Sequence, residues 1–179
     1  MATAKQVYKN PQNGTPLISV ISSGCKTPLL DIKFCNLIKP FYYPNSPTIP
    51  RYSITCLVDP EEHKEFLRGI QTIEKNEKVE TIIKNDAVKE GSEHFTTGKV
   101  LVKFQSKENV PVYMGGEFPR GECPLIELED ELARGEKVVV VYDILRYTKK
   151  NTMKTEHGIS FKPSCIYYYP SKPLHKKEA

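Results

Sequence analysis

Cationic and aromatic side chains occur together in three places along this sequence. Such a mixture suits the binding of a single-stranded nucleic acid, because cations contact the phosphates and flat rings stack on the bases. Every base offers a π-face, so this chemistry requires no particular base sequence. The predicted nucleic-acid-binding residues fall into three groups: Tyr42, Tyr43 and Arg51; Lys99 and Lys103; and Arg146, Tyr147, Lys149, Lys150, Lys154, Phe161 and Lys162.

Simpler interpretations compete for some of these side chains and their neighbours. A lysine-rich loop is often only solvated, and this alternative stays open for Lys149, Lys150 and Lys154. Core or cross-strand packing is the favoured interpretation for three other aromatic residues, Tyr142, Tyr167 and Tyr168. The lysines near the C-terminus are interpreted as solvated: Lys172, Lys176 and Lys177.

Catalytic chemistry is not indicated. The sequence lacks the patterns of a phosphate-binding loop, a dinucleotide-binding turn, a zinc protease and a serine hydrolase, and its four histidines are isolated. Asp59, Glu61 and Glu62 could form paired carboxylates, but their place at a predicted helix start favours capping. We therefore expect no enzyme, no cofactor and no metal. An enzyme with a dispersed metal site is the weakest alternative.

Composition describes an ordinary folded protein with an uneven charge distribution. Hydrophobic residues make up 39% and charged residues 27%, which excludes disordered and fibrous classes. The five cysteines form no CxxC pair, so we expect reduced, mostly buried thiols. Six cations and one acid lie in residues 1–51, and five cations and one acid in 146–162; residues 117–136 hold seven acids and two arginines. Such a polarised surface would attract a polyanion to one side.

The predicted elements make a small mainly β fold. Alternating apolar and polar residues predict strands, and Asp59-Pro60 followed by apolar residues at helical spacing predicts a helix over 60–76. The principal predicted strands are 30–38, 51–58, 97–105, 135–147 and 159–168, with a brief one at 112–114. This order predicts a five-stranded OB-like antiparallel barrel with one helix after the second strand. The charged segment 77–96 is predicted to be a connector.

One domain is expected, with an extension at each end. Residues 1–28 are predicted to form a flexible arm with one short strand, 29–169 the OB-fold nucleic-acid-binding domain, and 170–179 a basic disordered tail. No apolar run approaches the roughly 20 residues of a membrane span, and residues 1–13 lack the apolar core of a signal peptide. The expected location is the cytoplasm, with no membrane partner.

The order of these parts resembles bacteriophage single-stranded DNA-binding proteins of the podovirus OB-fold type. The resemblance covers residues 30–168 and depends on the strands beginning at Ile32 and Arg51, the proline-initiated helix, and the late paired strands. It implies a DNA groove formed by Arg51, Lys99, Lys103 and a basic finger over 146–162. Such proteins commonly end in an acidic tail, whereas this chain ends in His175-Lys176-Lys177-Glu178-Ala179. The acidic stretch 127–131 is a hypothetical substitute for recruiting partners.

The leading hypothesis is a non-catalytic protein that coats single-stranded DNA during replication or recombination, in the host cytoplasm if the protein is viral. The alternative is a structural or adaptor β-domain of a virion or replisome that binds protein. RNA is not separated from DNA by the sequence, because both polymers offer phosphates and stacking bases. Homo-oligomers and contacts with replication or recombination proteins also stay open.

Overall fold

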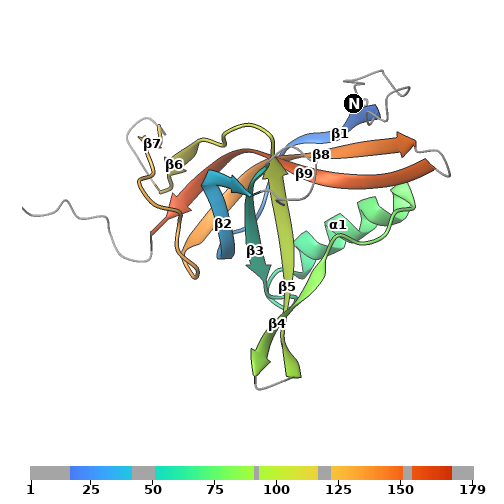
Figure 1. Ribbon diagram of the computed structural model, residues 1–179, viewed down its shortest axis with the longest axis horizontal. Coiled ribbons are helices and arrows are strands. Elements are labelled where there is room, and N and C mark those ends of the chain that lie inside the picture. Colours follow the sequence, from blue (N-terminus) through green and yellow to red (C-terminus); the bar gives the residue numbers. More distant parts are fainter. Residues whose placement is uncertain (1–16, 42–50, 91–92, 117–121, 151–154, 171–179) are drawn as a thin grey trace, which may run out of the picture.

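The computed structural model describes residues 17–41, 51–90, 93–116, 122–150 and 155–170 (Figure 1). Within these residues one helix accompanies nine strands. In chain order the elements are β1 (Leu17–Lys26), β2 (Leu30–Phe41), β3 (Arg51–Val58), α1 (Lys64–Glu77), β4 (Lys84–Glu90), β5 (Glu93–Ser106), β6 (Val112–Met114), β7 (Leu125–Ile126), β8 (Lys137–Lys150) and β9 (Thr155–Tyr169).

The strands form an open, OB-like sheet rather than the predicted closed barrel of five strands. Their order is β4-β5-β3-β2-β8-β9-β6-β7, and β1 pairs with β8. All pairs are antiparallel except β6 with β9. The prediction of a five-stranded barrel is therefore corrected to a nine-stranded sheet.

The additional strands lie where the sequence pattern is weak. Residues 17–26, placed in the predicted arm, form β1 along β8, and the predicted connector 77–96 contains β4. β4 lies at one end of the strand order, and charged residues are common in such edge strands. Its sequence, KNDAVKE, consequently shows no apolar alternation. The other predicted strands correspond to β2, β3, β5, β6, β8 and β9.

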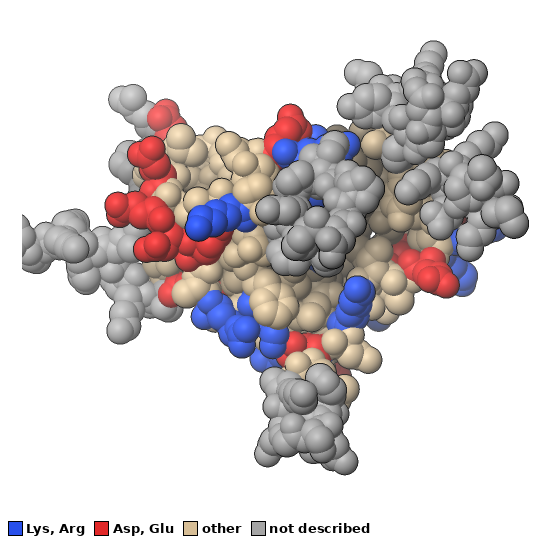
Figure 2. Space-filling view, in the orientation of Figure 1, with Lys and Arg blue, Asp and Glu red and all other residues tan. Residues whose placement is uncertain are grey.

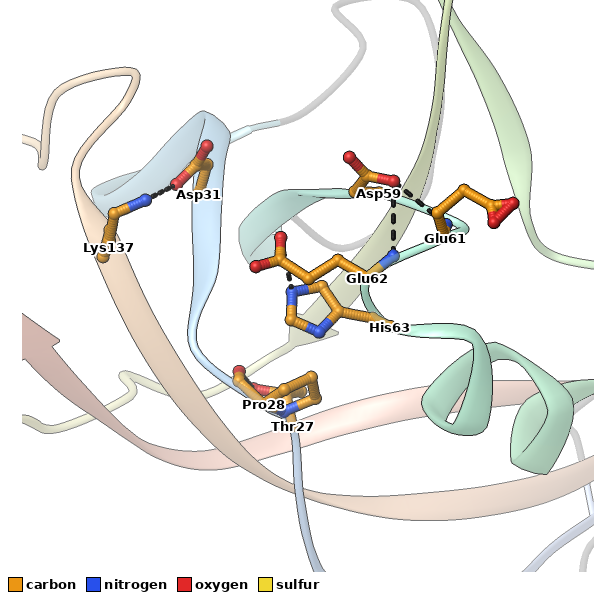
Figure 3. Close-up of polar contacts among 8 residues, drawn as sticks. All are labelled: Thr27, Pro28, Asp31, Asp59, Glu61, Glu62, His63 and Lys137. Atoms are coloured by element: carbon orange, nitrogen blue, oxygen red, sulfur yellow. Dashed lines mark hydrogen bonds and ion pairs between the residues drawn. The ribbon is translucent and has the colours of Figure 1, made fainter.

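The helix begins later than predicted. A turn over residues 60–63 precedes α1, which starts at Lys64. The Asp59 carboxylate accepts the backbone N–H groups of Glu61 and Glu62 at 2.9 and 3.4 Å (Figure 3). Asp59 therefore has the predicted capping role, although it caps the turn before the helix. Figure 1 places α1 beside the ends of β8 and β9.

The core lies on the inner face of the sheet. On β3, Ile54, Cys56 and Val58 are fully buried, as the alternation predicts. Three rings pack at its centre: Phe104 lies 5.0 Å from Tyr142 and 5.7 Å from Phe161 between ring centroids. Tyr142 is thus a core residue, as predicted. All five cysteines are free, but only Cys56 is fully buried; the expectation of mostly buried thiols is corrected for the others, which are partly exposed.

One carboxylate secures the end of β2. Glu131 accepts three consecutive backbone N–H groups, from Leu37, Ile38 and Lys39, at 2.6, 2.9 and 3.0 Å. The pairing of β2 with β3 is interrupted in this part of the strand, between Asn36 and Phe41. The acidic segment after β7 thereby replaces a neighbouring strand as the hydrogen-bond acceptor.

Replacing Glu131 by alanine should destabilise the protein by about 1–3 kcal/mol, because backbone donors near the sheet lose a charged acceptor. Urea unfolding followed by circular dichroism measures this free energy. Glu129→Ala is the matched control, since Glu129 is an exposed acid of the same segment, and it should change stability by less than about 0.5 kcal/mol. Equal losses of unfolding free energy in both variants would contradict the role of Glu131 as the acceptor that stabilises the end of β2.

Candidate nucleic-acid interface

An extra residue in β2 determines which side chains face outward. Ile32 pairs with Cys56, but Phe34 pairs with Thr55, so Lys33 has no counterpart on β3. Such a β-bulge inverts the alternation of faces beyond it. Ile32 is consequently 1% exposed and Phe34 49% exposed. Regular alternation along the predicted strand 30–38 would place these two side chains on one face, and the bulge places them on opposite faces.

The exposed Phe34 ring borders a hollow of about 380 Å³. Pairing aligns Phe34 with Thr55 on β3, and Thr55 with Lys103 on β5. Lys84 of β4 pairs with Leu101 of β5 farther along the same hollow. We call this hollow the groove; its lining residues are Phe34, Thr55, Ile82, Lys84, Leu101, Lys103, Gln105, Ile159, Ser160 and Phe161.

Cations surround this mostly apolar groove. Lys84 and Lys103 are exposed in its lining. The Lys33 ammonium and the Arg134 guanidinium lie 5.9 and 5.6 Å from the centroid of the Phe34 ring, within cation–π range. In Figure 2, Lys and Arg side chains gather toward the lower middle of the visible face, whereas acidic side chains dominate its left end, near β7. This face therefore carries cations beside the groove and acids at the end near β7.

The predicted site residues do not form a single cluster. Of Arg51, Lys99 and Lys103, only Lys103 lines the groove. Lys99 directly follows Gly98, whose φ is positive, and Arg51 is the first residue of β3; neither is part of the groove lining. Lys149 and Lys150 belong to β8, and the structure describes their backbone only. The remaining predictions, Tyr42, Tyr43 and Lys154, lie outside the described residues.

Intramolecular contacts hold three residues of the predicted basic finger. Arg146 forms a two-pronged ion pair with Glu77 of α1, with Nε–Oε1 and Nη2–Oε2 distances of 2.5 and 2.8 Å. Lys162 pairs with Glu108 at 3.0 Å. The Tyr147 ring packs so closely on Gly158 that a Cβ there would lie 2.3 Å from its hydroxyl. These cations and this ring contribute to folded contacts before any ligand binds.

Phe161 requires a correction. Its side chain is 1% exposed, and its ring packs against Phe104 and Tyr142 in the core. The ring therefore supports the base of the groove and offers no free face for stacking. The prediction of a base-stacking Phe161 is wrong because β9 alternates, and Phe161 falls on its inner side.

Several residues that line the groove or contact the Phe34 ring were not predicted from the sequence. Phe34 was missed because a bulge cannot be identified from apolar periodicity alone. Lys84 was missed because β4 was assigned to a connector, and Arg134 because its neighbours are acidic. Gln105 had the correct signal, since alternation along the predicted strand 97–105 places it on the same face as Lys103.

Two features were not found among the described residues, a metal-binding cluster and a membrane-spanning helix. No group of three or more His, Cys, Asp or Glu side chains there could hold a metal ion. No helix among those residues is long and apolar enough to cross a membrane.

The described strands and helix share their arrangement with a class of bacteriophage single-stranded DNA-binding proteins. Three solved structures carry this comparison. The C-terminally truncated protein of bacteriophage Enc34 is 14% identical, covering 96% of this chain and 97% of that one, with a TM-score of 0.57. The Enc34 protein in complex with single-stranded DNA is 15% identical, with coverages of 98% and 100% and a TM-score of 0.55.

The third structure is the gp2.5 single-stranded DNA-binding protein of bacteriophage T7. It is 13% identical, the alignment covers 87% of this chain and 96% of that one, and the TM-score is 0.54. No protein-family model matches the sequence, and no curated protein sequence matches it. At these identities the likeness establishes the fold, which agrees with the resemblance found in the sequence.

The ion pair between Arg146 and Glu77 should make stability depend on pH. The hydrogen bonds from Arg146 hold the pKa of Glu77 below its ordinary value of 4.5. The pair is therefore fully stabilising above about pH 4.5, and this stabilisation is lost as the pH falls through the lowered pKa. Glu77→Gln should cost about 1 kcal/mol at pH 7 and progressively less below pH 4.5, as measured by urea unfolding at each pH.

Glu65→Gln is the control for this measurement, because Glu65 lies exposed on the same helix. It should leave the unfolding free energy unchanged within about 0.5 kcal/mol at pH 7. A cost for Glu77→Gln that stays constant down to pH 3 would show that the ion pair does not supply the stability.

Proposed function

We propose that this protein binds single-stranded DNA without sequence preference, through the groove and the Phe34 ring. One observation carries the proposal: an exposed aromatic ring borders a mostly apolar, cation-flanked groove on the outer side of β2, β3 and β5. The fold supports it, because a neighbour with the same fold has been solved in complex with single-stranded DNA. RNA is the competing ligand, since both polymers can use these contacts.

Each part of the groove matches one part of a single strand. A base stacks on Phe34, and the apolar side chain of Leu101 receives the face or edge of an adjacent base. The ammonium groups of Lys84 and Lys103 contact phosphates and release the counterions that surround the free strand. A duplex keeps its bases stacked inside, so its rings do not reach such a groove without unstacking.

The position of Arg134 adds a second stacking plane. Its guanidinium lies 5.6 Å from the Phe34 ring centroid, and guanidinium planes also stack on bases. A bound base either shares the ring with Arg134 or displaces it. In both cases Arg134 belongs to the DNA site. It lies in an acidic segment, but its own positive charge attracts the DNA.

The wider role that we infer is coating of DNA during replication or recombination, without catalysis, in the host cytoplasm of a bacteriophage. We infer that the predicted basic finger over 146–162 and the predicted aromatic residues Tyr42 and Tyr43 also contribute to DNA binding. The rival proposal is a protein-binding adaptor, for which the exposed Leu125 and the acids around it would be the relevant surface. Oligonucleotide binding separates the two.

Removing the Phe34 ring should weaken binding about tenfold. Loss of one stacked base costs about 1–3 kcal/mol, and 1.4 kcal/mol corresponds to a factor of ten. Fluorescence anisotropy of labelled oligo-dT measures the change for Phe34→Ala, with oligo-U and a duplex of equal length in parallel. Leu125→Ala, which removes another exposed apolar side chain, should leave affinity unchanged. If the wild type binds no oligonucleotide even at low salt, the adaptor proposal replaces this one.

The lysines of the groove should determine part of the salt dependence. For single strands, each phosphate contact contributes about 0.7 to the slope of log affinity against log salt concentration. Lys103→Gln and Lys84→Gln should therefore each reduce the magnitude of this slope by about 0.7, measured by anisotropy from 50 to 300 mM salt, roughly the range in which such effects are large. Lys64→Gln on α1 is the control. An unchanged slope in both groove variants would remove these lysines from the interface.

A further inference from the structure

A buried ion pair links two strands that are not neighbours. The Lys33 ammonium of β2 lies 3.0 Å from Asp86 Oδ1 of β4, although β3 and β5 come between them in the strand order. Both side chains are shielded from water: Lys33 is 12% exposed and Asp86 4%. The other carboxylate oxygen, Oδ2, accepts a hydrogen bond of 2.9 Å from the Thr97 hydroxyl.

Each partner stands at an irregularity of its strand. Lys33 is the extra residue that turns Phe34 outward. Asp86 lies where the register of β4 with β5 shifts, between Asn85 and Ala87. The opposing segment contains Gly98, whose φ of 84° is readily adopted only by glycine. One ion pair thus joins the two places at which the sheet departs from regular pairing.

We propose that Asp86 is a positioning residue for the DNA groove, acting by holding Lys33 and thereby the bulge that presents Phe34. A strand without the bulge would place Phe34 on the face of Ile32, toward the core. A buried ammonium without a partner is strongly disfavoured, so Lys33 keeps its place only while Asp86 receives it. The bulge therefore depends on a residue of another strand, and the mechanism deepens the function proposed above.

The ionisation of Asp86 is consistent with this role. Burial by itself raises the pKa of Asp86, but the ion pair with Lys33 and the hydrogen bond from Thr97 outweigh it and hold the pKa below the ordinary value. The carboxylate is therefore charged at neutral pH, which is the form that can hold an ammonium group.

The sign of the effect on binding distinguishes positioning from simple electrostatics. Asp86→Asn removes a negative charge and releases a cation close to the Phe34 ring, so electrostatics alone predicts tighter binding of a polyanion. Loss of positioning predicts weaker binding. We expect a three- to tenfold loss of affinity for oligo-dT in wild-type background and no further loss in a Phe34→Ala background, because the effect passes through that ring.

Two further variants keep the test interpretable. Val112→Ala creates a small core defect on β6, away from the groove, and should leave affinity unchanged despite a lower melting temperature. Thr97→Val removes only the hydroxyl that steadies Asp86, and should shift affinity in the same direction by a smaller factor. If Asp86→Asn does not fold, Thr97→Val serves as the test in its place.

A measurement without DNA separates this proposal from the proposed function. The chain contains no tryptophan, so F34W introduces a single tryptophan at the groove, whose emission can be excited selectively over that of the ten tyrosines. Adding D86N to F34W should change its emission maximum and its quenching by acrylamide. An unchanged fluorophore environment overturns the positioning role, and so does unchanged or tighter oligo-dT binding by D86N. If the wild type fails to bind DNA, the proposed function fails and the fluorescence alone decides the positioning role.

Discussion

The β-bulge at Lys33, where β2 has one residue more than β3, determines which side chains of β2 face outward from the sheet. Before it, Leu30 and Ile32 are buried in the core; after it, Phe34 faces water. A strand carries side chains with strict period two, so only an inserted residue can produce both outcomes in one strand. The groove owes its aromatic border to this backbone irregularity and its floor to the regular strands β3 and β5.

Charge is arranged around this geometry in two regions. The groove is flanked by lysines and Arg134, while the segment after β7 exposes acids such as Glu127 and Glu129. Glu131 belongs to that acidic segment yet is used internally, because its carboxylate accepts backbone N–H groups at the end of β2. The acidic segment is therefore a structural brace of the strand that carries Phe34, as well as a repulsive boundary for a polyanion.

The sequence predicted the regular parts of this protein and missed its irregular ones. β3 was predicted with its exact bounds because Tyr52 to Val58 alternate without interruption, and the core role of Tyr142 followed from its strand context. The strand count failed because edge strands carry charge and short strands lack periodicity. Within the site, Lys103 was predicted from a regular strand, whereas Phe34 depends on a bulge set by a contact between distant strands.

The bulge also makes β2 unusually sensitive to changes in length. Deleting Lys33, the one residue between Ile32 and Phe34, would restore continuous pairing with β3. Every later side chain of the strand would then move to the opposite face of the sheet. A substitution alters one contact, but an in-frame loss of one codon here would turn an aromatic ring inward and Cys35 outward together. Sequence drift in this strand is therefore expected to proceed by replacement of residues, with insertions and deletions confined to the segments that connect strands.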